Sequence, residues 1–448
     1  MYRYGSIAVA SLVVPRRACV VERSPALSFT VTRGFAVLQH RDFTLYLCGR
    51  FLASVATQML IIAVGWQVYH ITGRVLDLGL IGLSQFVPFL CLSLFAGHAA
   101  DQFDRRWIIV LCLSVYSLCA ALLLGFALAK IAVVWPIYLV LAFLGMARAF
   151  QTPAAQSFVP NIVPVATLGN AIAVSSSTFQ VATIVGPSIG GVVYAFGETM
   201  HGVQGGAAWV YGVAGTMLAA SLAMMLFITA RRAAFERTAA TWDSLLEGLR
   251  FVWRRKPVLG AISLDLFAVL FGGATALLPA FTKDVLHAGP EVFGYLRAAP
   301  GVGAGLTALW LTWRPVTRRV GVQMFGGVAL FGLATVVFGL TDRFWVAFLA
   351  LVLMGGGDMV SVYIRHLLVQ LETPDEIRGR VSAVNSVFIG ASNELGEFES
   401  GLTAAWFGLV PAIVVGGVVT LAVTALWAGA LFPRLRRLQS FDQLKDHS

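Results

Sequence analysis

The strongest constraint on this chain is a series of apolar stretches, each long enough to cross a lipid bilayer. The hydrocarbon core of a bilayer is about 30 Å thick, so a spanning helix needs about 20 mostly apolar residues. Hydrophobic residues make up 58% of the 448 and charged residues only 12%, which leaves too little polar surface for a soluble fold of this size. The sequence therefore predicts an all-α membrane protein with twelve transmembrane helices, near residues 43–70, 75–99, 107–129, 132–159, 167–196, 207–229, 258–285, 291–313, 320–340, 344–371, 381–407 and 409–432.

The distribution of basic residues predicts how the chain is oriented. The termini and the loops that follow the even-numbered spans together hold 24 Lys and Arg, whereas the opposite loops hold 4. Because basic residues gather on the cytoplasmic side, both termini are expected in the cytoplasm, with the chain in a bacterial inner membrane. Residues 1–33 are expected to be a cytoplasmic tail or an over-extended start, because their apolar run is too short to span.

The same composition argues against several other classes of protein. The formal charge of +10 is scattered in short clusters and forms no nucleic-acid-binding motif, so nucleic acid is not expected as a partner. The histidines and cysteines show no metal-ligand spacing, and the chain contains no phosphate-binding loop that would make it an ATP motor. No nucleophile, base and orienting group occur together, so the sequence predicts no enzyme, no catalytic residue, no metal and no cofactor.

The sequence contains an internal repeat, which predicts two structurally similar halves. The longest polar segment between spans, residues 230–257, separates a bundle of six helices at 42–229 from another at 258–432, with tails at 1–41 and 433–448. A shift of 210 residues without gaps gives nine identities over 47 positions, mostly at Gly and Pro, including Gly145 with Gly355 and Gly191 with Gly401. Chance similarity between apolar segments is the alternative. A repeat of this kind is typical of transporters whose substrate site lies between the halves.

Three short motifs carry a family resemblance. The loop after the second span reads GHAADQFDRR, the fourth span contains LGMARAFQTPAA, and the fifth contains GPSIGG. They resemble the major facilitator superfamily, and together with LDLFAVLFGGATALLP in the seventh span and the polar run at 370–401 they resemble its branch of enterobactin exporters and macrolide efflux proteins. The resemblance covers about residues 35–432 and implies two pseudo-symmetric six-helix bundles that work by alternating access.

The motifs also predict where the moving parts lie. The resemblance makes Gly97, Asp101, Arg105 and Arg106 a cytoplasmic gate, although a tight charged turn would explain the same residues. In the packing motif Gly186, Pro187, Gly190 and Gly191, small residues permit close helix contact, and the small-residue run at 300–305 in the eighth span is expected to be the matching surface.

Ionisable residues inside the spans point to a central site. The resemblance assigns Arg148 to proton coupling, and the offsets between the halves place Asp358 opposite Arg148 and Asp265 opposite Arg50. A central cavity between the halves would hydrate both signs of charge, whereas hydrocarbon would solvate neither.

The run NELGEFESG adds three carboxylates to one span. Glu394 and Glu397 are three residues apart and nearly share a helix face, whereas Glu399 lies about 160° from Glu397. Glu394 and Glu397 are therefore placed in the cavity and Glu399 outside it. Arg297 and Arg365 lie near span ends, where snorkelling to the interface would suffice.

These observations favour a secondary active transporter, specifically a proton-driven exporter of an amphipathic small molecule such as a drug or siderophore-like compound. Its expected partners are the small-molecule substrate, protons and the lipid bilayer, and a monomer is expected. At least one of Asp265, Glu394 and Glu397 is predicted to change protonation during transport, with a static polar network as the alternative. An importer of the same fold, or a non-transporting receptor or scaffold, remains open on these residues.

Overall fold

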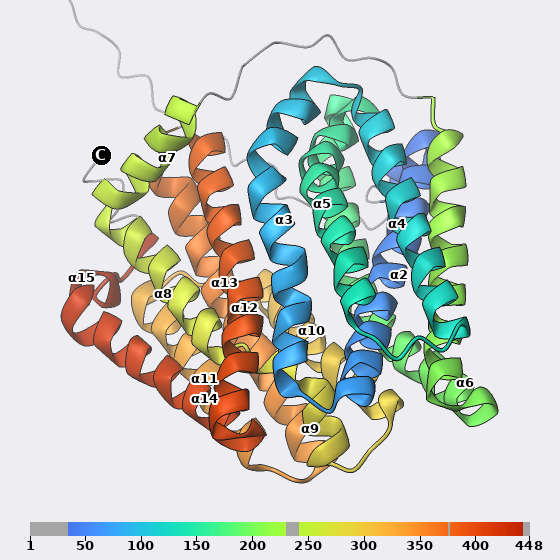
Figure 1. Cartoon of the computed structure of the whole chain (residues 1–448). Helices are drawn as coiled ribbons and strands as arrows, with labels where there is room; N and C mark the ends of the chain where they lie inside the picture. The colour runs from blue at the N-terminus through green and yellow to red at the C-terminus, as the bar shows by residue number, and fades with distance from the viewer. Residues whose placement is uncertain (1–34, 230–241, 375–376, 442–448) are drawn as a thin grey trace, which may run out of the picture.

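The computed structural model describes residues 35–229, 242–374 and 377–441, so the predicted tail at 1–33 lies outside the described residues. Within these ranges every regular element is helical (Figure 1). The first part of the chain forms η1 (Phe35–Gln39), α2 (Arg41–Thr72), α3 (Val75–Gln102), α4 (Arg105–Leu128), α5 (Trp135–Phe158), η2 (Val159–Asn161), η3 (Val165–Thr167) and α6 (Leu168–Leu226).

The second part begins with a short helix outside the predicted spans. Two more helices, α8 and α9, are joined by a 3-10 turn and together cover the seventh predicted span. The elements are α7 (Trp242–Arg254), α8 (Lys256–Gly272), η4 (Ala274–Leu277), α9 (Leu278–Asp284), α10 (Pro290–Trp313), α11 (Val320–Leu340), α12 (Phe344–Glu372), α13 (Arg378–Phe407), α14 (Leu409–Leu426), η5 (Trp427–Leu431) and α15 (Pro433–Arg436).

One very long helix contains two spans. The 59 residues of α6 are interrupted at Gly202, whose φ of 76° and ψ of −179° are not helical. A residue with a Cβ rarely adopts that φ, so glycine is suited to the turn. The apolar segments Leu168–Gly202 and Gly205–Leu226 correspond to the fifth and sixth predicted spans.

Ten helical segments of the described chain are long and apolar enough to cross a bilayer. The other two predicted spans are α10 and α13, which have 24 and 30 residues but a less apolar composition over a span's length. Arg297 lies on α10, and Asn393, Glu394 and Glu397 lie on α13. The two helices that depart most from lipid-like composition are therefore candidates for a polar interior.

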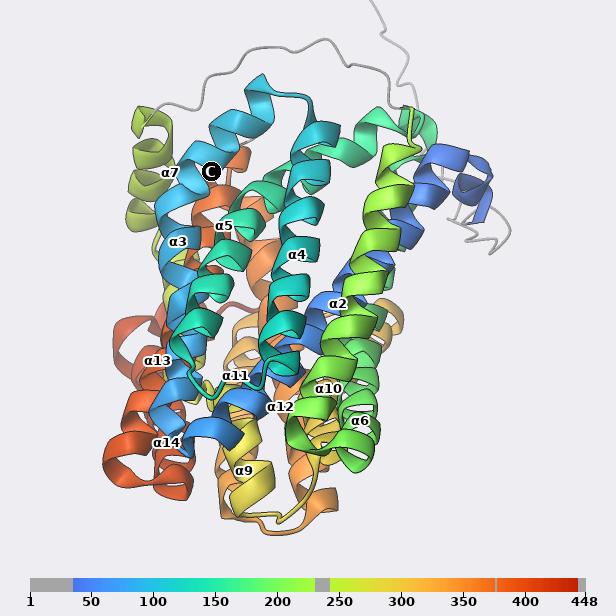
Figure 2. The ribbon, with the colours of Figure 1, turned by 45° about the vertical axis from the view of Figure 1, so that its right-hand side comes forward.

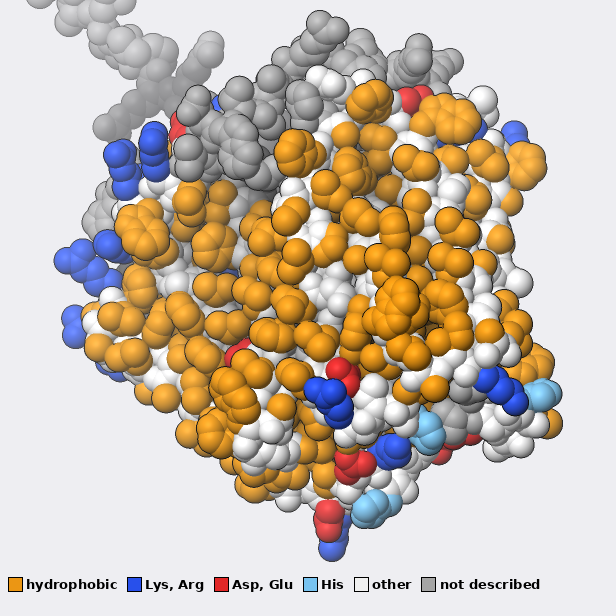
Figure 3. Space-filling model, viewed as in Figure 1, with side chains coloured by type: hydrophobic (Ala, Val, Ile, Leu, Met, Phe, Trp, Pro, Cys, Tyr) orange, Lys and Arg blue, Asp and Glu red, His pale blue; other side chains and the backbone are white. Residues whose placement is uncertain are grey.

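The outer surface fits a membrane environment. Hydrophobic side chains dominate the middle of the face in Figure 3, and charged side chains gather toward its margins. Trp313 and Trp345 are 81% and 76% exposed, and each lies at or next to a helix end. Aromatic residues favour this depth because they bury an apolar ring near the polar headgroups.

The two parts of the chain contact each other through a pair of pseudo-equivalent helix crossings, α6 with α10 and α3 with α13. A Cβ added to Gly191 would lie 3.0 Å from Gly294 Cα, and one added to Gly401 would lie 2.8 Å from Gly79 Cα. Gly191 and Gly401 are the last matched pair of the internal repeat. The repeat thus conserves the glycines that let backbones of opposite halves touch.

The short helix α7 is an element that hydropathy did not predict. It lies on the connection between the halves, at the margin of the bundle in Figure 2. It packs against α13, where Glu247 forms an ion pair with Arg380. Its exposed Trp253 and Leu249 accompany a basic end, a composition typical of helices at a membrane surface. The amphipathic spacing within 242–254 was the signal that could have identified it.

Candidate functional site

A cavity of about 680 Å³ lies between the two halves. It reaches toward the end of the molecule where α2 begins and where α5 and α6 finish. Its wall mixes apolar residues with a dense set of polar ones from α2, α3, α4, α5, α6, η4, α10 and α13: Tyr46, Arg50, Ser54, Thr57, Gln58, Gln85, Tyr116, Arg148, Gln151, Thr152, Gln156, Ser221, Thr275, Arg297, Asn393, Glu394 and Glu397.

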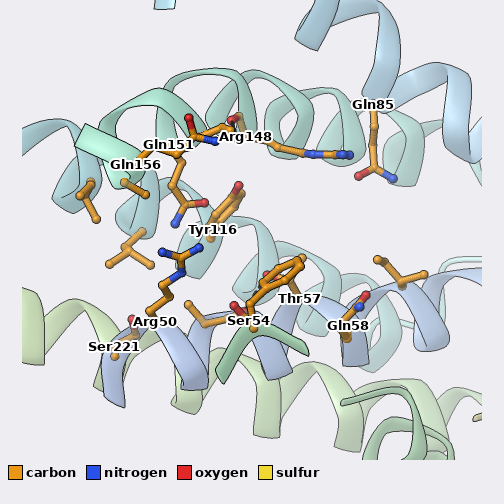
Figure 4. Close-up of a pocket in the computed structure, with 18 of the residues that line it drawn as sticks. Arg50, Ser54, Thr57, Gln58, Gln85, Tyr116, Arg148, Gln151, Gln156 and Ser221 are labelled. Carbon is orange, nitrogen blue, oxygen red and sulfur yellow. Dashed lines mark hydrogen bonds between the residues drawn. The ribbon is translucent and has the colours of Figure 1, made fainter. Parts of the chain in front are cut away.

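Helical spacing explains why these residues gather. On α5, Arg148, Gln151 and Thr152 recur at intervals of three and four residues, so they share one face. On α2 the same rule aligns Arg50 with Ser54, and Figure 4 shows the Arg50 side chain directed from α2 toward Gln151 on α5. The cavity is thus walled by polar stripes on helices that are otherwise apolar.

One ion pair crosses the cavity between the halves. Arg148 Nη1 donates to Glu394 Oε1 at 2.5 Å, and the Arg148 guanidinium also lies 5.4 Å from the centre of the Phe89 ring. The Glu394 side chain is 11% exposed, whereas that of Arg148 is 47% exposed. The carboxylate is therefore held in the wall while its cationic partner reaches the cavity space.

A second ion pair lies nearby within the second half, between α13 and α10. Arg297 Nη2 is 3.7 Å from Glu397 Oε1, and both side chains line the cavity. The expectation that Arg297 snorkels to the interface is wrong. Its position opposite Glu397 arises because α10 and α13 each present one face to the same cavity, which span hydropathy cannot reveal.

Asp265 and Asp358 lie outside this cavity, contrary to the expectation that they face the first-half arginines across it. Asp265, 5% exposed, forms an ion pair with Arg365, and Asp358 is close enough to interact electrostatically with both. Asp358 and Arg365 are seven residues apart on α12, so they share a face that meets α8. The cationic partner of these acids therefore comes from the second half and not from the first-half arginines.

Arg365 is likewise not a snorkelling residue. It is 2% exposed and is among the largest fully buried side chains of the described residues. The seven-residue spacing from Asp358 was the sequence signal that could have indicated a buried partner.

Glu399 occupies a different face of α13 from Glu394 and Glu397, as its helical angle requires. Thr403 Oγ1 donates to Glu399 Oε1 at 2.6 Å within the same helix. It is absent from the cavity wall.

The small-residue motif of α6 divides its contacts between two helices. Gly186 and Gly190 face α2 in the same half, where an added Cβ would lie 2.6 Å from Gln58 Cβ and 3.0 Å from Met59 Cα. Gly191 faces α10 in the other half, where an added Cβ would lie 2.5 Å from the carbonyl oxygen of Pro290.

The partner surface on α10 lies nearer its beginning than the sequence suggested. The Pro187 carbonyl oxygen would be 2.5 Å from a Cβ added to Gly294. Gly301 also faces α6, but less closely, since an added Cβ would lie 3.0 Å from the Ile184 side chain and 3.8 Å from the Thr183 carbonyl oxygen, and Gly303 packs on α12. Gly294, outside the expected run at 300–305, therefore provides the close approach.

Side chains at the far end of the cavity close it from that side. Tyr69 on α2 donates a hydrogen bond to Asp284 on α9, and Lys283 Nζ lies 3.4 Å from His70 Nδ1. Trp66 stacks on Phe293 with ring centres 6.0 Å apart. No sequence pattern predicted these pairings, because each joins residues more than 200 positions apart.

We expect Gly191→Leu to force this closed end apart. A leucine side chain cannot fit where even a Cβ lies 2.5 Å from the Pro290 oxygen. Spin labels at exposed Arg74 and Arg343, in a background without native cysteines, should move apart by on the order of 5 Å in double electron–electron resonance. The matched control is Gly212→Leu, because a Cβ at Gly212 meets nothing within 4 Å. Equal distances in the two variants would contradict the role given to this crossing.

The predicted gate residues lie at the open end. Arg105 Nη1 donates to the Ser157 carbonyl at 2.9 Å, and Arg106 Nη2 donates to the Leu226 carbonyl at 2.7 Å. These carbonyls belong to the last turns of α5 and α6, where the helix dipole favours a cation. Both hydrogen bonds join elements of the first half.

The other two predicted gate residues are Gly97 and Asp101. A Cβ on Gly97 would meet nothing within 4 Å, so Gly97 does not permit a close helix approach in this conformation. The side chain of Asp101 lies outside the described residues. In the part of the chain that the structure describes, no group of three or more His, Cys, Asp or Glu could hold a metal ion.

Comparisons with known proteins agree with this architecture. The multidrug efflux pump Tap of Mycolicibacterium fortuitum is 29% identical over 413 residues, which cover 88% of this chain and 96% of Tap. The enterobactin exporter EntS of Escherichia coli O81 (strain ED1a) is 25% identical over 399 residues, which cover 86% of this chain and 93% of EntS.

Solved structures show the same fold at lower identity. A bacterial homolog of the human lysosomal transporter Spinster, in an inward-facing and unoccupied conformation, matches with a TM-score of 0.66 and 17% identity, over 89% of this chain and 97% of that one. An inward-facing bacterial homologue of the iron transporter ferroportin matches with a TM-score of 0.65 and 14% identity, over 87% and 99%.

A family model described as transmembrane secretion effector matches residues 32–447. The match spans almost the whole chain, including both halves and the cavity between them. The chain is therefore a multi-pass membrane transporter of the major facilitator superfamily and belongs to the transmembrane secretion effector family.

Proposed function

We propose that this transporter exports an amphipathic small molecule, a drug or siderophore-like compound, from the cytoplasm in exchange for protons. The observation that carries the proposal is the cavity of about 680 Å³ between the halves, crossed by the Arg148–Glu394 pair. Its volume lies in the range of small-molecule sites, and its wall combines apolar surface with charged and amide groups. An amphipathic molecule can satisfy both kinds of surface at once.

The proposed cycle moves residues 42–229 against residues 258–432 about the fixed site. With both termini in the cytoplasm of a bacterial inner membrane, as the positive-inside rule favours, the open end faces inward and the Tyr69–Asp284 contact closes the outside. The loop with Gly97, Asp101, Arg105 and Arg106 would close the inner end in the opposite state. A single chain contains both halves, so the proposal requires only a monomer.

Protons would act on the ion pairs of the cavity. Protonation of Glu394 removes the charge that holds Arg148, and so weakens a contact between the halves. Protonation of Glu397 would release Arg297 within the second half and change the charge of the cavity wall. Export rather than import is supported by the family description and by the printed functions of Tap and EntS. We extend those functions to this chain only as a direction of transport.

The proposal predicts lower accumulation of a substrate in cells that express the protein, with accumulation restored by a protonophore. A susceptibility and siderophore-secretion screen of a deletion strain would first identify the compound, and proteoliposomes with an imposed pH gradient would then show flux of the pure molecule. Cells expressing Gly191→Leu serve as the control for expression without normal cycling. Higher accumulation on expression would indicate an importer, and no flux of any screened compound would favour a receptor or scaffold.

A further inference from the structure

The charges in the cavity wall do not balance. The cavity wall contains three arginines and two glutamates. Glu394 pairs with Arg148 at 2.5 Å, and Glu397 pairs with Arg297 at 3.7 Å. Arg50 has no carboxylate within ion-pair distance among the residues that the structure describes. One guanidinium therefore faces the cavity without a counter-charge from the described protein.

The contacts of Arg50 fix its position but do not neutralise it. Arg50 Nη1 donates to the Tyr46 hydroxyl at 3.3 Å, and that hydroxyl donates to the Ala155 carbonyl at 3.2 Å. Tyr46 is 4% exposed, so it anchors the arginine from a buried position. A guanidinium has five N–H donors, and the Arg50 guanidinium lines the cavity and is directed toward Gln151 (Figure 4).

The depth of Arg50 makes an uncompensated charge costly during transport. Arg50 lies nine residues into α2, or roughly 13 Å along the helix from Arg41. Water in the open cavity can solvate it in the present conformation. Closure of this end in the opposite state would remove that water, and a buried cation without a partner is strongly disfavoured.

We propose that the substrate is an amphipathic organic anion whose carboxylate, or similar oxyanion, is bound by Arg50. The inference rests on the proposed function and adds the substrate's charge and orientation. The planar guanidinium matches an oxyanion in a two-point contact. The apolar part of the molecule would then lie along Ile61, Ile81 and Phe179, which line the same cavity.

The test compares molecules that differ only in the anionic group. A panel of aromatic carboxylic acids and their methyl esters, including rhodamine B and its ester, is bound to the purified protein and followed by fluorescence polarisation or thermal shift. The wild-type protein should bind the acid of a preferred pair about tenfold more tightly than the ester or better, which corresponds to about 1.4 kcal/mol. Arg50→Gln should bring the ratio of acid to ester affinity to about one. Arg50→Lys should retain part of that preference, because lysine keeps the positive charge but lacks the planar pair of N–H donors.

Arg314→Gln is the matched control, since it removes an exposed arginine at the end of α10, outside the cavity. It should leave the ratio unchanged. The proposal is overturned if the wild-type protein prefers the acid of no pair, or if Arg50→Gln keeps the wild-type ratio. Proton-driven export of neutral or cationic compounds with unchanged Arg50→Gln kinetics would leave the exporter function standing and reject only the anion site. Absence of export in every variant would instead reject the proposed function.

Discussion

Replacing Glu394 with glutamine is expected to abolish proton-driven efflux while leaving the protein folded. Glutamine keeps the size and polarity of the side chain but cannot release or take up a proton, so the 2.5 Å contact with Arg148 can no longer be switched by protonation. Efflux driven by a pH gradient should fall by about 100-fold or more, a scale associated with loss of one proton-transferring group. Substrate exchange without a gradient should persist, because it requires no net proton movement.

The structure provides a matched control on the same helix. Glu399→Gln removes an equal charge from α13 at a position outside the cavity, and it should transport normally. Melting in detergent should remain close to wild type for Glu394→Gln, since Arg148 stays 47% exposed and can be hydrated when its partner becomes neutral. Full gradient-driven efflux by Glu394→Gln would contradict a coupling role for this carboxylate, and would transfer that role to Glu397 or Asp265.

The second large effect is expected on stability, from Arg365→Met. Arg365 is 2% exposed and neutralises Asp265 while interacting with Asp358, so its removal leaves two carboxylates in an apolar interior. Breaking a buried ion pair by deleting one partner typically costs about 3–5 kcal/mol. Thermal melting in detergent and titration with SDS should both report this loss.

The cluster of Asp265, Asp358 and Arg365 also predicts that removing the arginine destabilises the protein more than removing one acid. Asp265→Asn should cost much less than Arg365→Met, because Arg365 would still face Asp358. The triple variant Asp265→Leu, Asp358→Leu, Arg365→Met should recover much of the stability, since apolar residues of similar volume often replace buried ion clusters without loss. Equal destabilisation by Asp265→Asn and Arg365→Met would contradict this arrangement. Retention of proton-driven efflux by Asp265→Asn would assign the cluster to folding alone.

Much of the architecture was predictable because its causes are local. The twelve predicted spans agree with the helices within a few residues, and α10 and α13, the two spans of least lipid-like composition, both contribute to the cavity wall. Glu394 and Glu397 reach the cavity together because the helix repeat places them on one face.

The pairing of charges was not predictable in the same way. The halves are related by repeat, so Arg50 and Asp265 occupy equivalent helices, yet only Arg50 lines the cavity. Asp265 forms an ion pair with Arg365 instead, because Arg365 lies on the face of α12 that packs against α8. Repeat symmetry fixes backbone positions, whereas the identity of neighbouring side chains decides which charges meet.

The sequence alone determined that this chain is helical, crosses a membrane many times, consists of two related halves and carries charge inside its spans, because hydropathy, helical period and glycine placement act along the chain. Only the tertiary structure decided that Arg148 meets Glu394, that Arg297 meets Glu397, and that Gly191 touches Gly294. Those contacts depend on which faces of distant helices pack together. In a membrane the hydrophobic effect does not select among such faces, so close packing and charge pairing between the helices make the choice.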